Sequence, residues 1–219
     1  MKHKIVIFDL DGTLLNTIGD LAAACEVVMI KRSLPSHTLE EYTSFVGNGI
    51  RNLVERSLPE EYRYDEYIDC AKVDFVDYYT RNIRNNTRPY EGITALVADL
   101  EAAGVKIAVA SNKFQQGTEE LVAHFFPTTH FVAVYGNREG FPLKPDAALI
   151  AEILSKADAK KSECVMVGDS AVDIHTARNA GIRSVGVSWG FRPHTELEQA
   201  GADRIADSVE QLREILLGE

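Results

Sequence analysis

The chain has 219 residues, of which 45% are hydrophobic and 26% are charged, and its formal net charge is -10. This composition excludes a disordered protein and favours one core with an insertion, while the negative charge argues against nucleic acid as the main partner. No stretch is long and apolar enough to cross a bilayer, and the three cysteines show no paired spacing. We therefore expect a cytoplasmic protein with no membrane partner.

The chain begins with an apolar segment, residues 5–8, which predicts a buried strand. From Thr17 to Arg88 apolar residues recur at helical spacing instead, and no convincing strand is visible. Helices are expected there at 20–31, 39–45 and 50–57 and within 62–84. Because this region is too long for a simple crossover, we predict an inserted α-helical domain over residues 17–88, with residues 1–16 and 89–219 forming the core domain.

Strands and helices alternate in the rest of the chain. Short apolar segments predict strands at 105–110, 131–134, 164–167 and 184–187, and amphipathic segments predict helices at 93–103, 117–126, 147–156 and 171–180. This alternation is typical of an α/β fold with a doubly wound parallel sheet and right-handed crossovers.

Polar side chains follow three of the predicted strands, and a lysine precedes a later helix. These residues are Asp9 and Asp11, then Ser111, Asn112 and Lys113, then Asp169 and Asp173, and finally Lys144. Each group by itself is commonly a turn or a helix cap. Since ligands bind outside the carboxyl ends of the strands in such a sheet, their convergence on one edge predicts a functional site.

Clustered carboxylates without cysteine or spaced histidine ligands favour Mg²⁺, with Asp9 and Asp169 as the natural side-chain ligands and Asp11 as a further metal candidate. The Lys144 ammonium and the Ser111 hydroxyl, with the Asn112 amide beside it, suit phosphate oxygens. The sequence therefore predicts a phosphoryl-transfer site, and it lacks the glycine-rich loop of P-loop enzymes.

Without such a loop, the protein itself must supply the covalent chemistry. We predict that Asp9 is the nucleophile and forms an aspartyl-phosphate, while Lys144 neutralises charge on the transferred group. Asp11 is predicted to act as general acid and then as general base. With Asp169 and Asp173 nearby, a protonated Asp11 would relieve the repulsion among four carboxylates.

Four motifs occur in order between residues 9 and 173: "DLDGT", "SN", the lysine of "LKPD", and "GDSAVD". Together they resemble the haloacid dehalogenase superfamily. The resemblance implies a Rossmann-like core, an obligatory Mg²⁺ and catalysis through an aspartyl-phosphate. It also implies that the helical insertion is a cap domain of the first, C1, class.

Within that superfamily, "FVGNGIRNLVERSL" at 45–58, with "SNK" and "VSWGF", is similar to the phosphoglycolate phosphatases. Gly47, Asn48 and Gly49 would let the cap backbone approach the substrate at a helix N-terminus that suits an anion. Arg51 would assist there, or it would pair with Glu55 one helical turn away. The stretch at 138–141 departs from the usual acidic pattern, which keeps pyrophosphate and other sugar phosphates open as substrates.

The leading functional prediction is a Mg²⁺-dependent phosphomonoesterase for a small phosphorylated metabolite, with 2-phosphoglycolate as the first choice. A phosphomutase similar to β-phosphoglucomutase is an alternative, although Thr13 favours hydrolysis because the mutases often have valine there. Dehalogenation is disfavoured by the presence of Asp11. A phospho-accepting signalling module is a remote alternative, since such modules carry no helical insertion.

Overall fold

The structure is a computed structural model that describes residues 3–218. The chain divides into two compact units: a sheet unit, which is the chain up to Asn16 together with the chain from Pro89 onward, and a helical unit, Thr17–Arg88. The chain passes between them where β2 (Leu15–Asn16) and β3 (Arg88–Pro89) pair as a small two-stranded sheet. Each unit is described by itself below.

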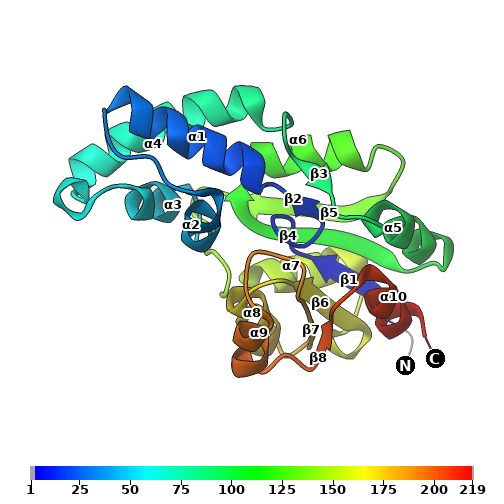
Figure 1. Cartoon of the computed structure of the whole chain (residues 1–219). Coiled ribbons are helices and arrows are strands. Elements are labelled where there is room, and N and C mark those ends of the chain that lie inside the picture. The colour runs from blue at the N-terminus through cyan, green and yellow to red at the C-terminus, as the bar shows by residue number, and fades with distance from the viewer. Residues whose placement is uncertain (1–2, 219) are drawn as a thin grey trace. The chain divides into compact units, whose positions relative to one another are not determined.

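The sheet unit contains six parallel strands in the order β5-β4-β1-β6-β7-β8 (Figure 1). Their bounds are β1 Ile5–Phe8, β4 Lys106–Phe114, β5 Phe131–Asn137, β6 Cys164–Gly168, β7 Arg183–Val187 and β8 Arg204–Ala206. The chain moves outward from β1 to β5 and then returns to the other side of β1. This reversal of strand order makes the sheet doubly wound and confirms the predicted α/β fold class.

Helices cover both faces of this sheet. They are α5 Ile93–Ala102, α6 Gln115–Phe125, α7 Ala148–Ala157, α8 Ala171–Ala180, α9 His194–Ala200 and α10 Val209–Leu217, with a short 3-10 turn at Lys161–Glu163. Helix α8 packs against α7 and α9, and α10 packs against α5. All four side chains of β1 are fully buried, as expected for a central strand with helices on both faces.

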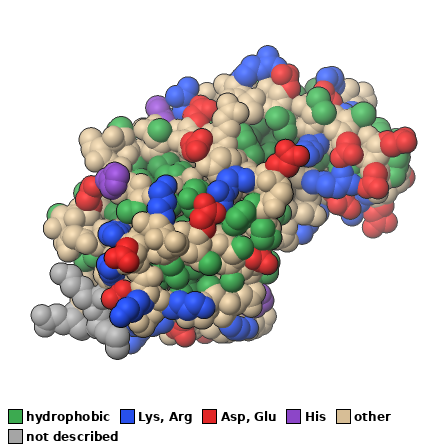
Figure 2. Space-filling model, turned by 180° about the vertical axis from the view of Figure 1, so that it is seen from behind, with side chains coloured by type: hydrophobic (Ala, Val, Ile, Leu, Met, Phe, Trp, Pro, Cys, Tyr) green, Lys and Arg blue, Asp and Glu red, His purple; other side chains and the backbone are tan. Residues whose placement is uncertain are grey.

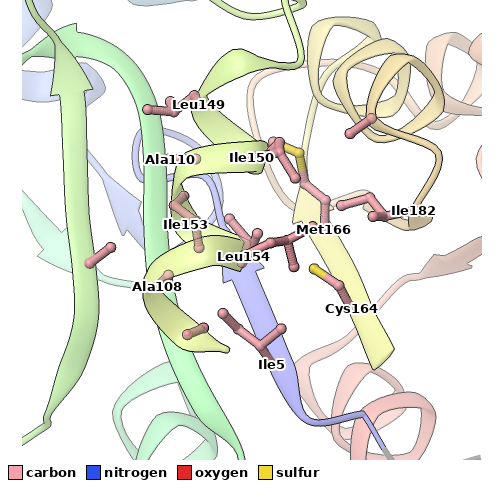
Figure 3. Close-up of a cluster of buried hydrophobic side chains, with 14 of the residues drawn as sticks. Ile5, Ala108, Ala110, Leu149, Ile150, Ile153, Leu154, Cys164, Met166 and Ile182 are labelled. Carbon is pink, nitrogen blue, oxygen red and sulfur yellow. The ribbon is translucent and has the colours of Figure 1, made fainter. Parts of the chain in front are cut away.

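One hydrophobic cluster of the core lies between α7 and the middle of the sheet (Figure 3). The apolar side chains of α7 point toward β4, β1 and β6, where Ile5, Ala108 and Met166 are buried. Small alanines on β4 face larger side chains on α7, so the two layers interdigitate. This packing fixes the strands whose carboxyl ends carry the predicted site.

Two parts of the sheet unit differ from the sequence-based prediction. Strand β4 continues to Phe114, so Ser111, Asn112 and Lys113 lie within it, in a stretch where the β4–β5 register shifts between Ala110 and Phe114. After Val187 the structure adds α9, β8 and α10, which we did not predict. Strand β8 has three residues and α9 has seven, too short for a clear apolar period.

The helical unit consists of α1 Ile18–Lys31, α2 Leu39–Phe45, α3 Ile50–Ser57 and α4 Asp65–Asn82, with a 3-10 turn at Glu60–Tyr62. Helix α1 packs against α2 and α4, and α3 packs against α4. Thr38 and Glu41 form a capping box at the start of α2. In the described part of the chain, no helix combines the length and the apolar character that crossing a membrane requires.

One buried carboxylate joins the two ends of the helical unit. Asp20, in the first turn of α1, is 2% exposed and accepts hydrogen bonds from the backbone N–H groups of Asn86 and Thr87, each at 2.8 Å. The Thr87 hydroxyl donates a further bond at 2.7 Å. The start of α1 is therefore tied to the segment that precedes β3.

Replacing Asp20 should test this connection. Asp20→Ala removes the acceptor for two backbone N–H groups and a buried hydroxyl, so we expect a loss of about 3 kcal/mol in the free energy of unfolding. Urea denaturation measures the change. The matched control, Asp77→Ala, removes an exposed carboxylate from α4 and should cost less than about 0.5 kcal/mol. Equal losses in the two variants would contradict this account.

Candidate active site

Three buried carboxylates meet at the carboxyl ends of the central strands. Asp9 follows β1, Asp169 follows β6, and Asp173 lies in the first turn of α8. One oxygen atom from each residue lies within 4.8 Å of the others. The sheet thus brings together three of the carboxylates that the sequence placed at one edge, and we call them the acidic cluster.

Local structure fixes each member of the acidic cluster. The Asp9 N–H donates to the Val167 carbonyl at 2.9 Å, which ties the end of β1 to β6. Asp173 accepts bonds from the Ser170 N–H at 3.2 Å and from its hydroxyl at 2.7 Å, an arrangement typical of a helix start. Asp169 accepts from the Thr13 hydroxyl at 3.1 Å and from the Phe191 N–H at 2.8 Å.

Lys144 supplies a buried positive charge to the acidic cluster. Its Nζ atom lies 2.9 Å from Asp9 Oδ1 and 2.7 Å from Asp173 Oδ1. The Asn112 side chain holds the Lys144 backbone on both sides: Asn112 Nδ2 donates to the Lys144 carbonyl at 3.0 Å, and the Lys144 N–H donates to Asn112 Oδ1 at 2.9 Å. The structure thus shows Asn112 positioning the lysine, a contact that the sequence did not indicate.

The acidic cluster holds more negative charge than its surroundings compensate. Burial raises the pKa of Asp9 to about 7, with Asp173 and Asp11 adding to the rise and Lys144 opposing it. Burial, Asp173 and Asp9 raise the pKa of Asp169 well above its usual value, against the bonds from Phe191 and Thr13. Burial alone would lower the pKa of Lys144, but Asp173 and Asp9 outweigh it and raise that pKa.

These residues fit a divalent cation that prefers oxygen ligands. Asp9 Oδ1 is buried and, apart from its ion pair with Lys144, has no hydrogen-bond partner. Asp169 keeps lone pairs beyond its two hydrogen bonds, whereas both oxygens of Asp173 are already engaged by Lys144 and Ser170. Asp9 and Asp169 are therefore the better candidates for direct ligands, with Asp173 holding the lysine.

Asp11 contacts a different cation. The chain bends after β1, so residues 9–11 do not continue that strand. Lys113 Nζ lies 3.2 and 3.4 Å from the two carboxylate oxygens of Asp11. Our charge count from the sequence omitted this second buried lysine. The sequence position of Lys113, directly after Ser111 and Asn112, could have indicated that it belongs to the site.

Other side chains complete the surroundings of the site. The Ser111 hydroxyl is buried and accepts a bond from the Lys113 N–H at 3.2 Å. The Trp189 indole N–H donates to the Thr13 carbonyl at 3.2 Å, and its ring lies beside that of Tyr90. Burial, with the charges of Asp169 and Asp11, raises the pKa of Tyr90, a residue that the sequence did not assign to the site.

The remaining predicted site residues lie in the helical unit. Gly47, Asn48 and Gly49 all have positive φ angles, of 127°, 59° and 87°, immediately before α3. Arg51 on α3 does not pair with Glu55, the partner considered from the sequence. It contacts Asp65 and Asp69, the latter at 2.6 Å, because these carboxylates on the neighbouring helix α4 lie within its reach.

Gly12 lets the turn after β1 pass directly over the acidic cluster. A Cβ atom at this position would lie 2.4 Å from Asp169 Oδ2, and the φ angle is +88°. Gly104 has a similar φ angle of +75° with nothing within 4 Å of its Cβ position. An alanine at either position would suffer backbone strain, but only at position 12 would its Cβ atom also overlap a neighbouring side chain.

We expect Gly104→Ala to lower the free energy of unfolding by about 1 kcal/mol through backbone strain alone. Gly12→Ala should cost at least about 2 kcal/mol more, because Asp169 is held by two hydrogen bonds and cannot move aside without breaking them. Urea denaturation of both variants gives the comparison. Similar losses would show that the turn does not press against Asp169.

The pKa of Asp9 predicts an unusual pH dependence of stability. Its pKa in the folded chain is about 7, against an ordinary value of 3.8. Between these values the folded state retains a proton that the unfolded state has released, so stability falls as pH rises from about 4 to 7. The Asp9→Asn variant has no carboxyl group to ionise at this position, so it does not lose this stability as the pH rises.

In metal-free buffer, Asp9→Asn should therefore be more stable than the wild type by up to about 4 kcal/mol at pH 8, and by much less at pH 5. Urea unfolding at the two pH values measures the difference. A stability difference that is the same at both values would show that Asp9 does not carry the raised pKa.

Sequence comparisons relate the chain to known proteins. The profile of the family described as haloacid dehalogenase-like hydrolase matches residues 6–187. A phosphoglycolate phosphatase of Mesorhizobium japonicum is 34% identical over 196 residues, which cover 87% of this chain and 85% of that protein. One from Agrobacterium fabrum is 35% identical over 199 residues, covering 89% and 85%.

The fold is also similar to that of solved structures. A provisionally named phosphoglycolate phosphatase from Lactobacillus delbrueckii subsp. bulgaricus superposes with a TM-score of 0.93 at 31% identity, and the match covers 100% of both chains. The profile match covers more than half of the chain and includes all four motifs. The protein therefore belongs to the haloacid dehalogenase-like hydrolase family.

Proposed function

We propose that the protein is a phosphatase that hydrolyses a small phosphorylated metabolite, with 2-phosphoglycolate as its substrate. The observation that carries the proposal is the buried Asp9 carboxylate, held between Lys144 and the acids Asp169 and Asp173 at the end of β1. Relatives that match almost the whole chain at 30% identity or more carry the name phosphoglycolate phosphatase.

We propose Mg²⁺ as the cofactor, held by Asp9 and Asp169. When bound, it would neutralise charge on the acidic cluster and polarise the phosphate oxygens. The raised pKa values of Asp9 and Asp169 support this assignment, because a divalent cation removes the repulsion that raises them.

The first step would be attack by an Asp9 carboxylate oxygen on phosphorus. The bond between phosphorus and the ester oxygen breaks, and Asp11 donates a proton to the departing alcohol. The Lys144 ammonium and the Ser111 hydroxyl would stabilise charge on the transferred phosphoryl group. Asp9 is then an aspartyl-phosphate.

In the second step, water would attack phosphorus while Asp11 accepts a proton from it. The bond between phosphorus and Asp9 breaks, inorganic phosphate leaves, and both aspartates return to their starting forms. Thr13 would support these steps through its hydrogen bond to Asp169, which holds that carboxylate in place.

The helical unit is proposed to act as the cap, with Gly47, Asn48, Gly49 and Arg51 as candidates for contact with the substrate. This assignment rests on the resemblance of residues 45–58 to the phosphoglycolate phosphatases. On the face shown in Figure 2, basic and acidic side chains are interspersed. A nucleic acid would need a continuous basic surface, which this face does not show.

Phosphate release from 2-phosphoglycolate and a panel of other phosphomonoesters tests the proposal. We expect hydrolysis that requires Mg²⁺ and stops on chelation. Asp9→Asn should abolish it, and Asp11→Asn should slow it about 10²- to 10⁴-fold because the nucleophile remains. Asp158→Asn, at an exposed position after α7, should retain wild-type activity. A wild-type protein that releases no phosphate from the panel would overturn the proposal.

A further inference from the structure

Strand β4 places a second lysine in the interior of the site. The Lys113 side chain is 2% exposed, against 17% for the Asp11 carboxylate that it contacts. A buried ammonium group is costly unless a partner compensates it, so this ion pair has a structural reason to persist. The distances of 3.2 and 3.4 Å to the two oxygens show that the ammonium faces the whole carboxylate.

The two partners sit on different kinds of backbone. Lys113 belongs to the central strand β4, and its backbone is packed tightly: a Cβ atom on Gly136 would lie 2.4 Å from the Lys113 carbonyl oxygen. Asp11 lies on the turn after β1, outside the regular strand. In such a pair the strand residue fixes the position of the turn residue.

Asp9 and Asp11 are only two residues apart in the sequence, but they pair with different lysines. Lys144 pairs with Asp9 and Asp173, whereas Lys113 pairs with Asp11. Without Lys113, the Asp11 carboxylate would have a like charge on Asp9 nearby and no opposing cation from β4. Lys113 thus holds Asp11 through a cation other than the one that pairs with Asp9 and Asp173.

We propose that Lys113 is a positioning residue for the proton transfer performed by Asp11. This inference rests on the proposed function, since it concerns the leaving group of a phosphomonoester. Lys113 itself neither donates nor accepts the proton. The protonated form of Asp11 gives its proton to the alcohol oxygen as the ester bond breaks, and the carboxylate that results is the form that pairs with Lys113, which sets its direction.

Two substrates with different leaving groups distinguish this role from a general structural one. The alkoxide released from 2-phosphoglycolate needs a proton, whereas acetyl phosphate, which is of similar size, releases acetate and needs none. We expect Lys113→Met to lower kcat/KM for 2-phosphoglycolate by roughly tenfold or more, with KM nearly unchanged. The loss for acetyl phosphate should be much smaller.

A double-mutant cycle gives a second, independent readout. If Lys113 acts through Asp11, Lys113→Met should add little to the loss caused by Asp11→Asn, so the two effects are not additive. Lys113→Arg retains a cation on the strand and should restore much of the preference between the two substrates. Lys106→Met is the matched control: this lysine is also on β4, donates to the Ala157 carbonyl, and should leave both activities unchanged.

Thermal unfolding of each variant checks that it folds. If Lys113→Met does not fold, the Lys113→Arg variant still tests the inference. Equal losses for the two substrates, or additive effects in the cycle, would overturn the inference while leaving the proposed function intact. A wild-type protein that hydrolyses neither substrate would instead overturn the proposed function.

Discussion

The contact of the Lys144 ammonium with Asp9 and Asp173 is the interaction on which the site depends. It joins three distant parts of the chain: the end of β1, the loop before α7 and the first turn of α8. Burial makes each of these charges costly alone, so removing the Lys144 ammonium would leave both carboxylates uncompensated. The same requirement explains why Asn112 holds the lysine backbone on both sides.

The site has few positive charges to balance its carboxylates. Two buried lysines face different aspartates, and the pKa values of Asp9 and Asp169 remain raised despite them. The acidic cluster is thus an electrostatic cost of the folded state that a bound cation would offset. Buried carboxylates with raised pKa values are common in active sites, where they lower the stability of the fold.

The helical unit obeys a separate set of constraints. Its ends are joined by Asp20, whose hydrogen bonds to Asn86 and Thr87 hold the two chain connections together. Arg51 is engaged by two carboxylates of α4, so an anionic ligand would have to compete with them. The sheet unit and the helical unit therefore have independent internal supports.

The sequence by itself determined the α/β class, strands β1, β4, β5, β6 and β7 of the six-stranded sheet, and the polar residues near their carboxyl ends. It could do so because buried parallel strands are short apolar segments followed by polar side chains. It did not determine β8 and α9, which are too short to show a period. Tertiary structure alone decided which cation faces which carboxylate. Lys113 and Lys144 are 31 positions apart, and the sequence indicated a role for Lys144 but none for Lys113. Only the position of β4 beside β1, and of the loop before α7, assigns one lysine to Asp11 and the other to Asp9.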